Sequence, residues 1–351
     1  ASVIKKTQLS LFDFIGVLLC GDANGILNPL SDKYFSAIGG KKESTCLPGF
    51  EKLPAVNAAF CTGVKSHSIE LDDGHRHGTS HPSVAVIPAA LAVAERENSS
   101  MYELLYAICM GYEVMLRTAR SINPSHLKRG FHTTGTAGSF GSAMSCALLL
   151  KLNETEICHA ISIGGLQSAG LQEMLHENPS IKPLQAGKAA QAGVLSADLV
   201  KLGAKAPMSI YEGQHGWIKA MTDSFNENDL LAEIGKRWEI LNCYTKLYPT
   251  CRHCHQGIDI AIEMFNENID VNRIQKIEID TYSVAISEVG SVFFPKNLEE
   301  AMFSLPFSFA LGLKTGKVRL NELIPNLGNS ELHDLIKKIS INENQEMNDA
   351  Y

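Results

Sequence analysis

The stretch "TTGTAGSFGSAMSCALLLKL", residues 133–152, is made largely of Gly, Ala, Ser and Thr and ends in an apolar run. A second stretch of the same kind, "AGKAAQAGVLSADLVKLG", covers residues 186–203. Small side chains let helix backbones approach each other closely, because they shorten the distance between packed helix axes. We therefore expect two helices here that cross at the centre of a packed helical core.

The residues around these stretches predict a chain of two parts. Helical periodicity runs through roughly the first 240 residues, and helix starts such as Ser100-x-x-Glu103 and Asn153-x-x-Glu156 carry capping boxes. Beyond Trp238 the pattern changes to alternating strands with helices between them. The fold class is therefore expected to be mainly α, with a large all-α domain in residues 1–240 and a smaller α+β domain in residues 241–351. The strands are expected at 273–282 and 337–343, and the helices at 255–268, 298–313 and 330–339.

Composition excludes several classes of partner. The 351 residues carry a net charge of −7, which gives no electrostatic reason to expect nucleic acid. The longest apolar run, Val84–Ala94, is too short for the ~20 residues of a membrane span. Nine scattered cysteines fit reduced thiols, and so a cytoplasmic protein, better than a disulfide framework. Lys5 and Lys6 precede an apolar stretch that resembles a secretion signal, but Asp13 interrupts it, so an amphipathic helix is expected. Because the chain begins without Met, we expect a fragment of a longer protein.

An unusual concentration of ionisable residues precedes that apolar run. Gly74, Gly78 and the turn at Ser80–Pro82 indicate a loop. A solvated loop and a metal site are both possible readings, although His75-x-His77 is not the i, i+4 pair that a helix presents to a metal. We favour a loop that carries acid–base groups to the mouth of the helical core, because histidine suits proton transfer near neutral pH. The ionisable residues are His67, Glu70, Asp72, Asp73, His75, His77 and His81, of which His75 and His77 could be bystanders.

Two further candidates lie at the starts of the small-residue helices. His132 directly precedes a Gly/Thr-rich helix start, where free N–H groups suit an anion. The alternative is that Thr133 or Thr134 simply caps the helix. Lys182 lies just before the second helix and could pair with a substrate carboxylate. The alternative for Lys182 is an ordinary exposed lysine.

The segment "KLYPTCRHCHQGID", residues 246–259, suggests zinc or redox chemistry through Cys251-x-x-Cys254. No second Cys pair at close spacing completes a zinc knuckle, and no βαβ context supports a thioredoxin-like motif. The segment could instead contribute Lys246, Arg252 and His255 to an anion site between the two domains. The sequence also contains none of GxGxxG, GxxxxGK[ST] or GxSxG. We therefore expect proton chemistry without a cofactor on a small carboxylated molecule.

Taken in order, these segments resemble the MmgE/PrpD family, whose members include 2-methylcitrate dehydratase, cis-aconitate decarboxylase and iminodisuccinate epimerase. The resemblance implies a large all-α domain with an α+β lid, a homodimer, and neither metal nor organic cofactor. Family members are longer at both ends. The resembling segments are "HSIELDD…HPSVAVIPAALAVAE", "GYEVMLR", "GFHTTGTAGSFGSA", "KPLQAGKAAQAG", "YPTCRHCHQGID" and "EAMFSLPFSFALGLKTG".

Several positions depart from the family pattern. Many relatives have Asp in place of Glu70, and decarboxylases similar to the animal member have His in place of Cys251. Phe307 replaces a Tyr, and Gly74 lies where that subgroup tends to have Thr. The departures at Cys251, Phe307 and Gly74 weaken the decarboxylase assignment in particular. The family's active-site positions otherwise carry over onto Glu70, Asp72, Asp73, His81, His132, Lys182, Lys246 and His255.

The resemblance implies a lyase that acts on a di- or tricarboxylate. We expect His132 and His81 to be the acid–base pair, with Asp72 or Asp73 orienting an imidazole or binding a substrate hydroxyl. The leading expectation is dehydration of a 2-methylcitrate-like hydroxy acid. The alternatives are decarboxylation of cis-aconitate, epimerisation of iminodisuccinate, a non-catalytic carboxylate-binding homologue and, more remotely, a zinc-dependent hydrolase. The residues expected to bind substrate are Glu70, Lys182, Lys246, Cys251, Arg252 and His255.

Overall fold

The computed structural model describes residues 2–49, 51–177 and 179–350. Helices supply most of the regular structure and the strands are few and short, which confirms the prediction of a mainly α fold. The chain divides into two compact units. The first contains Ala1–Ser68 and Asp72–Thr245, and the second contains Ile69–Leu71 and Lys246–Tyr351.

The first unit is a bundle of helices with two short antiparallel strand pairs, β1 with β2 and β3 with β4. In order, its elements are α1 (Ser2–Asn24), α2 (Asn28–Ile38), β1 (Ser44–Thr45), β2 (Lys52–Leu53), α3 (Ala55–Ser66), β3 (Gly74–His75), α4 (Ser83–Arg96), α5 (Met101–Ile122), α6 (Ser125–Lys128), α7 (Thr133–Leu149), α8 (Glu154–Leu166), α9 (Glu173–Glu177), the 3₁₀ turn Pro179–Ile181, α10 (Pro183–Lys201), α11 (Trp217–Met221), α12 (Glu227–Leu231), the 3₁₀ turn Glu239–Asn242 and β4 (Cys243–Tyr244).

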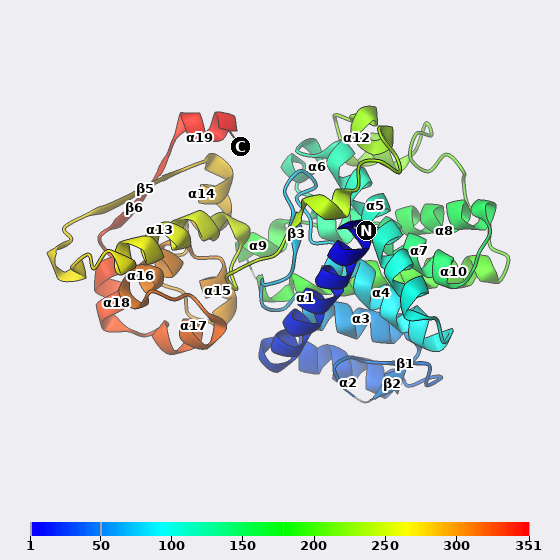
Figure 1. Ribbon diagram of the computed structural model, residues 1–351, viewed down its shortest axis with the longest axis horizontal. Coiled ribbons are helices and arrows are strands. Elements are labelled where there is room, and N and C mark those ends of the chain that lie inside the picture. The colour runs from blue at the N-terminus through cyan, green and yellow to red at the C-terminus, as the bar shows by residue number, and fades with distance from the viewer. Residues whose placement is uncertain (1, 50, 178, 351) are drawn as a thin grey trace. The chain divides into compact units, whose positions relative to one another are not determined.

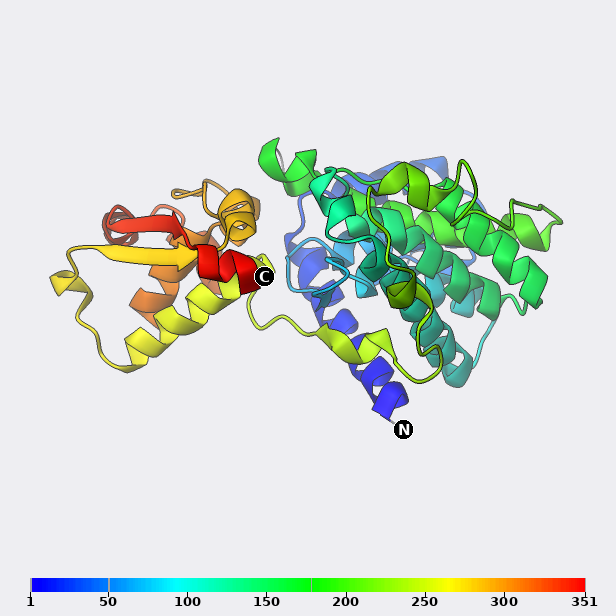
Figure 2. The ribbon, with the colours of Figure 1, turned by 90° about the horizontal axis from the view of Figure 1, so that it is seen from above.

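Helix α7 lies at the centre of this bundle. It contacts α4, α5, α8 and α10, and nearly all of its side chains are buried. Figures 1 and 2 both show α7, α8 and α10 side by side. The small-residue stretch at 133–152 therefore forms the core helix that the sequence predicts, and it packs against the small-residue stretch at 186–203.

The contacts of α7 are so close that only glycine fits at several positions. A Cβ atom on Gly193 of α10 would lie 2.5 Å from the carbonyl carbon of Ser142 in α7. A Cβ on Gly141 would lie 2.5 Å from the carbonyl oxygen of Gly111 in α5. Protein interiors are packed at the density of organic crystals, so such positions leave no space for a methyl group. The spacing of the helices, and hence the positions of their ends, is fixed by these backbone contacts.

Local signals in the sequence set the ends of the helices. Both predicted capping boxes form, Ser100 with Glu103 at the start of α5 and Asn153 with Glu156 at the start of α8. The expectation of a Thr cap on α7 is wrong. Its N-cap is His132, whose side chain makes no capping bond, and the hydroxyl of Thr134 instead accepts a hydrogen bond from the backbone N–H of His81.

The second unit combines helices with one parallel pair of strands. Strand β5 pairs with β6 from Ile277↔Ile339 to Thr281↔Glu343, which confirms both predicted strands. Helices α13 and α16 pack against each other (Figure 1). The elements are the 3₁₀ turn Arg252–Cys254, α13 (His255–Asn266), the 3₁₀ turn Val271–Arg273, β5 (Ile277–Thr281), α14 (Ser283–Val289), α15 (Leu298–Met302), α16 (Leu305–Thr315), α17 (Leu320–Asn326), α18 (Ser330–Ile336), β6 (Ile339–Glu343) and α19 (Gln345–Ala350).

The single helix expected at 298–313 is in fact two helices. Ser304 has an extended backbone and its hydroxyl accepts a hydrogen bond of 3.1 Å from the N–H of Phe307, so it caps α16. Pro306 occupies the first turn of α16, where its missing N–H costs nothing. The Ser-x-Pro signal therefore begins a new helix here and outweighs the apolar periodicity that runs through it.

Alanine substitutions at two glycines, one in the contact of α10 with α7 and one in α1, should change the free energy of unfolding in opposite directions. Gly193→Ala should lower the free energy of unfolding by about 1–3 kcal/mol, because the new methyl group would overlap Ser142. Gly16, at an exposed position of α1, has no atom within 4 Å of where a Cβ would lie, so in Gly16→Ala the higher helix propensity of alanine should raise stability by about 0.5–1 kcal/mol. Denaturation by urea, followed by circular dichroism, measures both. A stabilising Gly193→Ala would contradict the close crossing.

Candidate active site

Four segments of the first unit bring ionisable side chains into one buried group, here called the histidine cluster. The ring centre of His67 lies 5.1 Å from that of His81 and 6.1 Å from that of His132, and the rings of His67 and His132 stack within 18° of parallel. The positive charge of Lys182 lies close enough to lower the pKa of both His67 and His132. The segments are the end of α3, the loop before α4 and the starts of α7 and α10, and the cluster is His67, Asp72, His81, His132 and Lys182.

Asp72 joins two of the imidazoles. One oxygen of its buried carboxylate, Oδ2, lies 3.0 Å from Nδ1 of His67 and 3.0 Å from Nδ1 of His81. Nδ1 of His81 also lies 2.8 Å from the carbonyl oxygen of Asp73, which can only accept a hydrogen bond. A carboxylate beside an imidazole places the proton on the facing nitrogen. Both rings therefore carry hydrogen on Nδ1 and direct Nε2 away from the carboxylate.

His132 is oriented by Gln185, a residue that the sequence did not single out. Nδ1 of His132 lies 2.7 Å from the amide oxygen of Gln185, and the amide nitrogen of Gln185 donates a hydrogen bond of 2.9 Å to the carbonyl of Leu171. The bond to Leu171 fixes which end of the amide faces the imidazole. Because that end is an acceptor, His132 must carry its proton on Nδ1. Among the described residues no hydrogen bond engages Nε2 of His132, so this nitrogen is available to accept a proton.

Two imidazoles of the cluster, those of His67 and His132, are neutral at physiological pH. Burial, the largest cause, lowers the pKa of His67 to about 4 even though the Asp72 carboxylate favours the protonated ring. Burial and the charge of Lys182 hold the pKa of His132 well below its ordinary value. Desolvation outweighs the nearby carboxylate because it penalises any cationic ring in the interior. A neutral imidazole is the form that can act as a general base.

Asp73 has a different place from its neighbour Asp72. Its carboxylate accepts hydrogen bonds from the backbone N–H of Ser83 at 3.0 Å and from the hydroxyl of Tyr112 at 2.9 Å. Burial raises its pKa. Asp73 therefore anchors the loop to α4 and α5 with its side chain, and it reaches the histidine cluster only through its carbonyl oxygen on His81.

His75 and His77 lie outside the cluster. Nδ1 of His75 accepts a hydrogen bond of 3.0 Å from the N–H of Gly78, so its Nε2 must donate to the carboxylate of Glu239, 3.1 Å away. Both partners of this pair are buried, and β3 pairs with β4 next to it. His77 is exposed. The loop is thus held at His75 and presents a different set of groups, at Asp72 and His81, to the histidine cluster.

The remaining sequence-predicted residues lie in the second unit. The ammonium group of Lys246 donates to the carboxylate of Glu70 at 3.0 Å and to the carbonyl oxygen of Glu70 at 2.9 Å, and both residues are buried. Glu70 has a positive φ of 51°, a conformation that is uncommon outside glycine. Burial raises the pKa of the Cys251 thiol to about 12. Burial and then the charges of Lys246 and Arg252 lower the pKa of His255 to about 3.

Within the part of the chain that the structure describes, two groups of side chains have the composition of a metal site. In the second unit, the ligand atoms of Cys251, His253 and Glu288 lie within 4.8 Å of one another. Burial, followed by the charges of Arg252 and Lys246, lowers the pKa of His253 to about 4, and this positive environment opposes a cation. In the first unit, Asp32 groups with Cys46 and Cys61 in the same way, but the ammonium of Lys65 already contacts the Asp32 carboxylate at 2.8 Å. Neither group favours a metal in its present surroundings.

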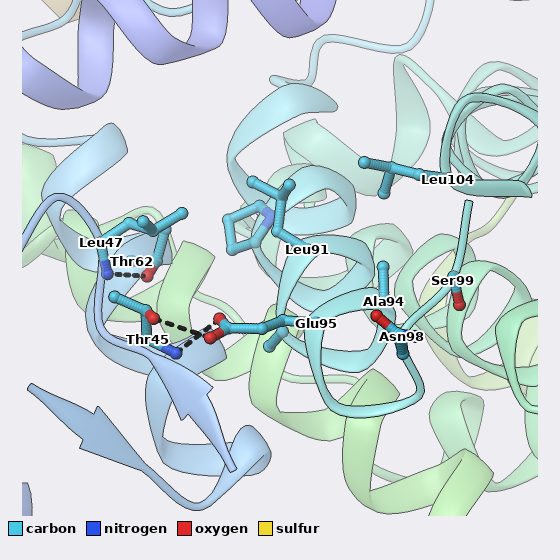
Figure 3. Close-up of a pocket in the computed structure, with 11 residues that line it drawn as sticks. Thr45, Leu47, Thr62, Leu91, Ala94, Glu95, Asn98, Ser99 and Leu104 are labelled. Atoms are coloured by element: carbon cyan, nitrogen blue, oxygen red, sulfur yellow. Dashed lines mark hydrogen bonds between the residues drawn. The ribbon is translucent and has the colours of Figure 1, made fainter. Parts of the chain in front are cut away.

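A pocket in the first unit lies apart from the predicted residues. It has a volume of about 300 Å³ and is lined by residues of β1, α3, α4 and α5 (Figure 3). Three of its polar residues bond to one another or to the backbone: Glu95 accepts hydrogen bonds from the N–H and the hydroxyl of Thr45, and Thr62 accepts one from the N–H of Leu47. No residue of the histidine cluster lines the pocket, and its ionisable side chain, Glu95, is held by Thr45 and by an ion pair with Lys52.

Comparison with known proteins identifies the class. The MmgE/PrpD N-terminal domain matches residues 1–228, and the MmgE/PrpD C-terminal domain matches residues 248–351. The chain therefore belongs to the MmgE/PrpD family, as its sequence motifs predict.

Its curated relatives include cis-aconitate decarboxylases. The human protein is 30% identical over 224 residues, which is 61% of this chain and 45% of the human one. The mouse protein is 25% identical over 353 residues, covering 97% of this chain and 71% of its own length. The protein of Aspergillus terreus is 24% identical over 346 residues, covering 91% of this chain and 70% of its own length. This chain spans less than half of the human relative that it matches and about 70% of the other two.

Among the described helices, no single one is both long and apolar enough to cross a bilayer. Helices α1 and α2, which are joined at a bend of 90°, are together long and apolar enough to do so.

Sequence reasoning missed two members of this site. His67 was noted only as part of a charged stretch, and Gln185 was not noted although it lies one helical turn after Lys182. Spacing could have suggested Gln185, because residues three apart at a helix start share a face. No local signal distinguishes His67 from His75, since the contacts that set them apart come from Asp72 in one case and Glu239 in the other.

The bond between Gln185 and His132 gives a second prediction. Gln185→Glu should raise the pKa of His132 by about 1–3 pH units, because it places a carboxylate where a neutral amide now lies 2.7 Å from Nδ1. Titration of the ring protons by NMR measures the pKa, and loss of the signal in His132→Asn assigns it. Gln191→Glu is the matched control, because it changes the same helix at a residue that contacts Lys188 instead. An unchanged titration in Gln185→Glu would contradict the proposed tautomer.

Proposed function

We propose that this protein is a lyase that needs no cofactor and dehydrates a 2-methylcitrate-like hydroxy acid. The observation that carries the proposal is the histidine cluster: the neutral imidazoles of His67 and His132 are buried together with the carboxylate of Asp72 and the ammonium group of Lys182, and His81 lies beside them. The family supports a small carboxylate as substrate. Loss of water from such a molecule requires removal of a proton from carbon beside a carboxylate and protonation of the departing hydroxyl group. Both are proton transfers that imidazoles perform near neutral pH.

Lys182 is the proposed binding group for a substrate carboxylate. It is the N-cap of α10, it is buried, and its charge already acts on two imidazoles. As the proton leaves carbon, negative charge grows on the adjacent carboxylate, and an ammonium group in a buried site stabilises that charge. A bound carboxylate also offsets the effect of Lys182 on His132. The pKa of His132 should then rise when substrate is present, which makes it a stronger base at the moment it is needed.

His132 is the proposed general base. Nε2 is the nitrogen left open by the Gln185 bond, and the low pKa keeps it unprotonated. It accepts the proton from carbon as the carbon–oxygen bond breaks and water leaves. His81 is the proposed acid. Its Nδ1 is held by Asp72 and by the carbonyl of Asp73, and its side chain is 16% exposed, so it can exchange protons with solvent between turnovers.

The second unit is assigned a binding role under the same proposal. Lys246 and Arg252 are candidate partners for a substrate carboxylate, with Glu70, Cys251 and His255 beside them in sequence or in space. The ammonium of Lys246 is already paired with the buried Glu70 carboxylate, and breaking such a pair leaves one charge unmatched, so a substrate carboxylate would have to join this pair. The proposed role of Arg252 rests on its place in the segment 246–259, and the roles of Glu70, Lys246, Cys251 and His255 rest on their match to family positions.

Decarboxylation of cis-aconitate is the second candidate function. It is favoured by the relatives, which are named for that reaction. It is disfavoured by Gly74, Cys251 and Phe307, which lie where the resemblance implies other residues in those decarboxylases. Phe307 is fully buried and lacks the hydroxyl of the tyrosine that it replaces.

Proton NMR in D₂O distinguishes the candidates in one experiment. The purified protein is mixed in turn with 2-methylcitrate, citrate, cis-aconitate and iminodisuccinate. Dehydration of 2-methylcitrate converts its methyl doublet into a singlet, because the neighbouring C–H is lost. Vinyl signals of itaconate from cis-aconitate would instead establish the decarboxylase, and deuterium at the α-carbon of iminodisuccinate would establish an epimerase. Binding without any conversion would support a carboxylate-binding homologue.

The proposed base gives a third prediction. His132→Asn should reduce turnover by about 10²–10⁴-fold, because it removes Nε2. The asparagine amide retains a donor near the position of Nδ1, so the bond to Gln185 and the helical circular dichroism should persist. An active His132→Asn enzyme would remove this residue from the mechanism.

Lys182 gives a fourth prediction with a control on the same helix. Lys182→Ala should raise the Michaelis constant or lower turnover, because a substrate carboxylate would lose its cation. Lys188→Ala should leave both unchanged, since that side chain is exposed and contacts Gln191. Steady-state kinetics with the substrate found by NMR measures both. Equal kinetics for the two variants would exclude Lys182 from the site.

The low pKa of His132 gives a fifth prediction. The base must be neutral, so activity should fall only when the pH drops through its pKa, which lies well below 6.5. A profile of kcat/KM against pH should therefore stay flat on its acid side down to at least pH 6.5. A loss of activity centred at or above pH 6.5 would show that another group, or a protonated His132, is required.

A further inference from the structure

His67 has one ring nitrogen that the protein leaves unsatisfied. Its side chain is completely buried and its Nδ1 is bonded to Asp72 at 3.0 Å. Its Nε2 is also buried, and it has no hydrogen-bond partner among the described residues. Buried polar atoms in native proteins nearly always have a partner, so one that lacks a partner calls for a group that is not part of the chain.

The hydrogen bonds define what kind of partner Nε2 needs. The Asp72 carboxylate holds the proton on Nδ1, and the pKa of about 4 keeps the ring neutral at physiological pH. Nε2 is then a pure acceptor and requires a donor. A carboxylate oxygen cannot serve, because it too is an acceptor. A hydroxyl group can.

The neighbours of His67 do not supply that donor. Nδ1 of His132 is bonded to Gln185, and Nδ1 of His81 is bonded to Asp72 and to the carbonyl of Asp73. What surrounds His67 is therefore two imidazoles whose Nδ1 protons are already engaged and the ammonium of Lys182, none of which donates a hydrogen bond to Nε2 of His67. A molecule that carries both a carboxylate and a hydroxyl group would match the ammonium and the open acceptor together.

We propose that Nε2 of His67 accepts a hydrogen bond from the hydroxyl group of the substrate and so determines specificity for hydroxy acids. This inference rests on the proposed function and adds the atom that recognises the hydroxyl. A site built to bond a hydroxyl rejects the analogue that lacks it, because the buried acceptor is then left unpaired. His67 would thereby select a hydroxylated tricarboxylate over an unsaturated or deoxygenated one.

Binding of two matched ligands tests the inference without relying on turnover. Citrate and propane-1,2,3-tricarboxylate differ only by the hydroxyl group, and their affinities can be compared by isothermal titration calorimetry at pH 7. The wild-type protein should bind citrate about 10-fold or more tightly than its deoxygenated analogue. In His67→Phe, which keeps a ring but has no acceptor, the ratio of the two affinities should fall to within about 2-fold of one. The affinity for the analogue itself should change little.

Two further variants keep the test decisive. The glutamine in His67→Gln places a polar amide at about the same distance from the backbone as Nε2, so this variant should keep part of the preference for citrate. It is used in place of His67→Phe if that variant does not fold. His77→Phe is the control, because His77 lies in the same loop but is exposed, and its ratio should equal that of the wild type.

The outcomes separate this inference from the proposed function. If neither tricarboxylate binds the wild-type protein, the proposed function fails and the inference fails with it. If both bind equally well, the carboxylate site stands but the inference is overturned, and a buried water satisfies Nε2. A preference for citrate that persists undiminished in His67→Phe would assign the hydroxyl to another residue.

Discussion

The architecture of the first unit depends on backbone contact between α7 and its neighbours. Gly193 lets α10 approach Ser142, and Gly141 lets α7 approach Gly111 of α5, at distances that exclude even a methyl group. Helices that touch in this way cannot slide without a collision, because packed interiors have no free volume. The N-terminal ends of α7 and α10 are therefore held side by side. His132 lies at one of these ends, and Lys182 and Gln185 lie at the other.

This arrangement produces a site in which burial controls the chemistry. Removing imidazoles from water makes their cationic forms costly, so His67 and His132 stay neutral although a carboxylate is present. Lys182 contributes the positive charge that an anionic ligand would meet. Asp72 and Gln185 do not add reactivity of their own. They decide which nitrogen of each ring carries the proton, and hence which nitrogen faces a ligand.

The surrounding loop shows how adjacent acidic residues take different tasks. Asp72 directs its carboxylate to two histidines, whereas Asp73 directs its own to Ser83 and Tyr112 and fixes the loop to the bundle. His75, tied to Glu239, holds the other side of the loop. A loop anchored at both sides positions His81 with little freedom, as the proposed proton-transfer role would require. Asp73 and His75 fix the loop through contacts within the protein, and these contacts do not require a substrate.

Much of the fold and part of the site follow from sequence alone, because they depend on local rules. Small residues at 133–152 and 186–203 predict the central helix crossing, capping boxes predict the starts of α5 and α8, and alternation predicts β5 and β6. The motifs also point to His81, His132 and Lys182, which the structure places in one cluster with Asp72. The Ser-x-Pro signal that begins α16 is also local, but the apolar periodicity that runs across it predicts a single helix.

Only the tertiary structure decided how the individual side chains are used. The sequence does not distinguish the surroundings of Asp72 from those of Asp73, or of His67 from those of His75, because each pair has similar chemistry a few residues apart. Their partners come from distant segments: Tyr112 for Asp73, Glu239 for His75 and Gln185 for His132. A hydrogen bond depends on distance and direction to within a few tenths of an ångström. Those quantities are fixed by how helices pack, which no single segment of the sequence encodes.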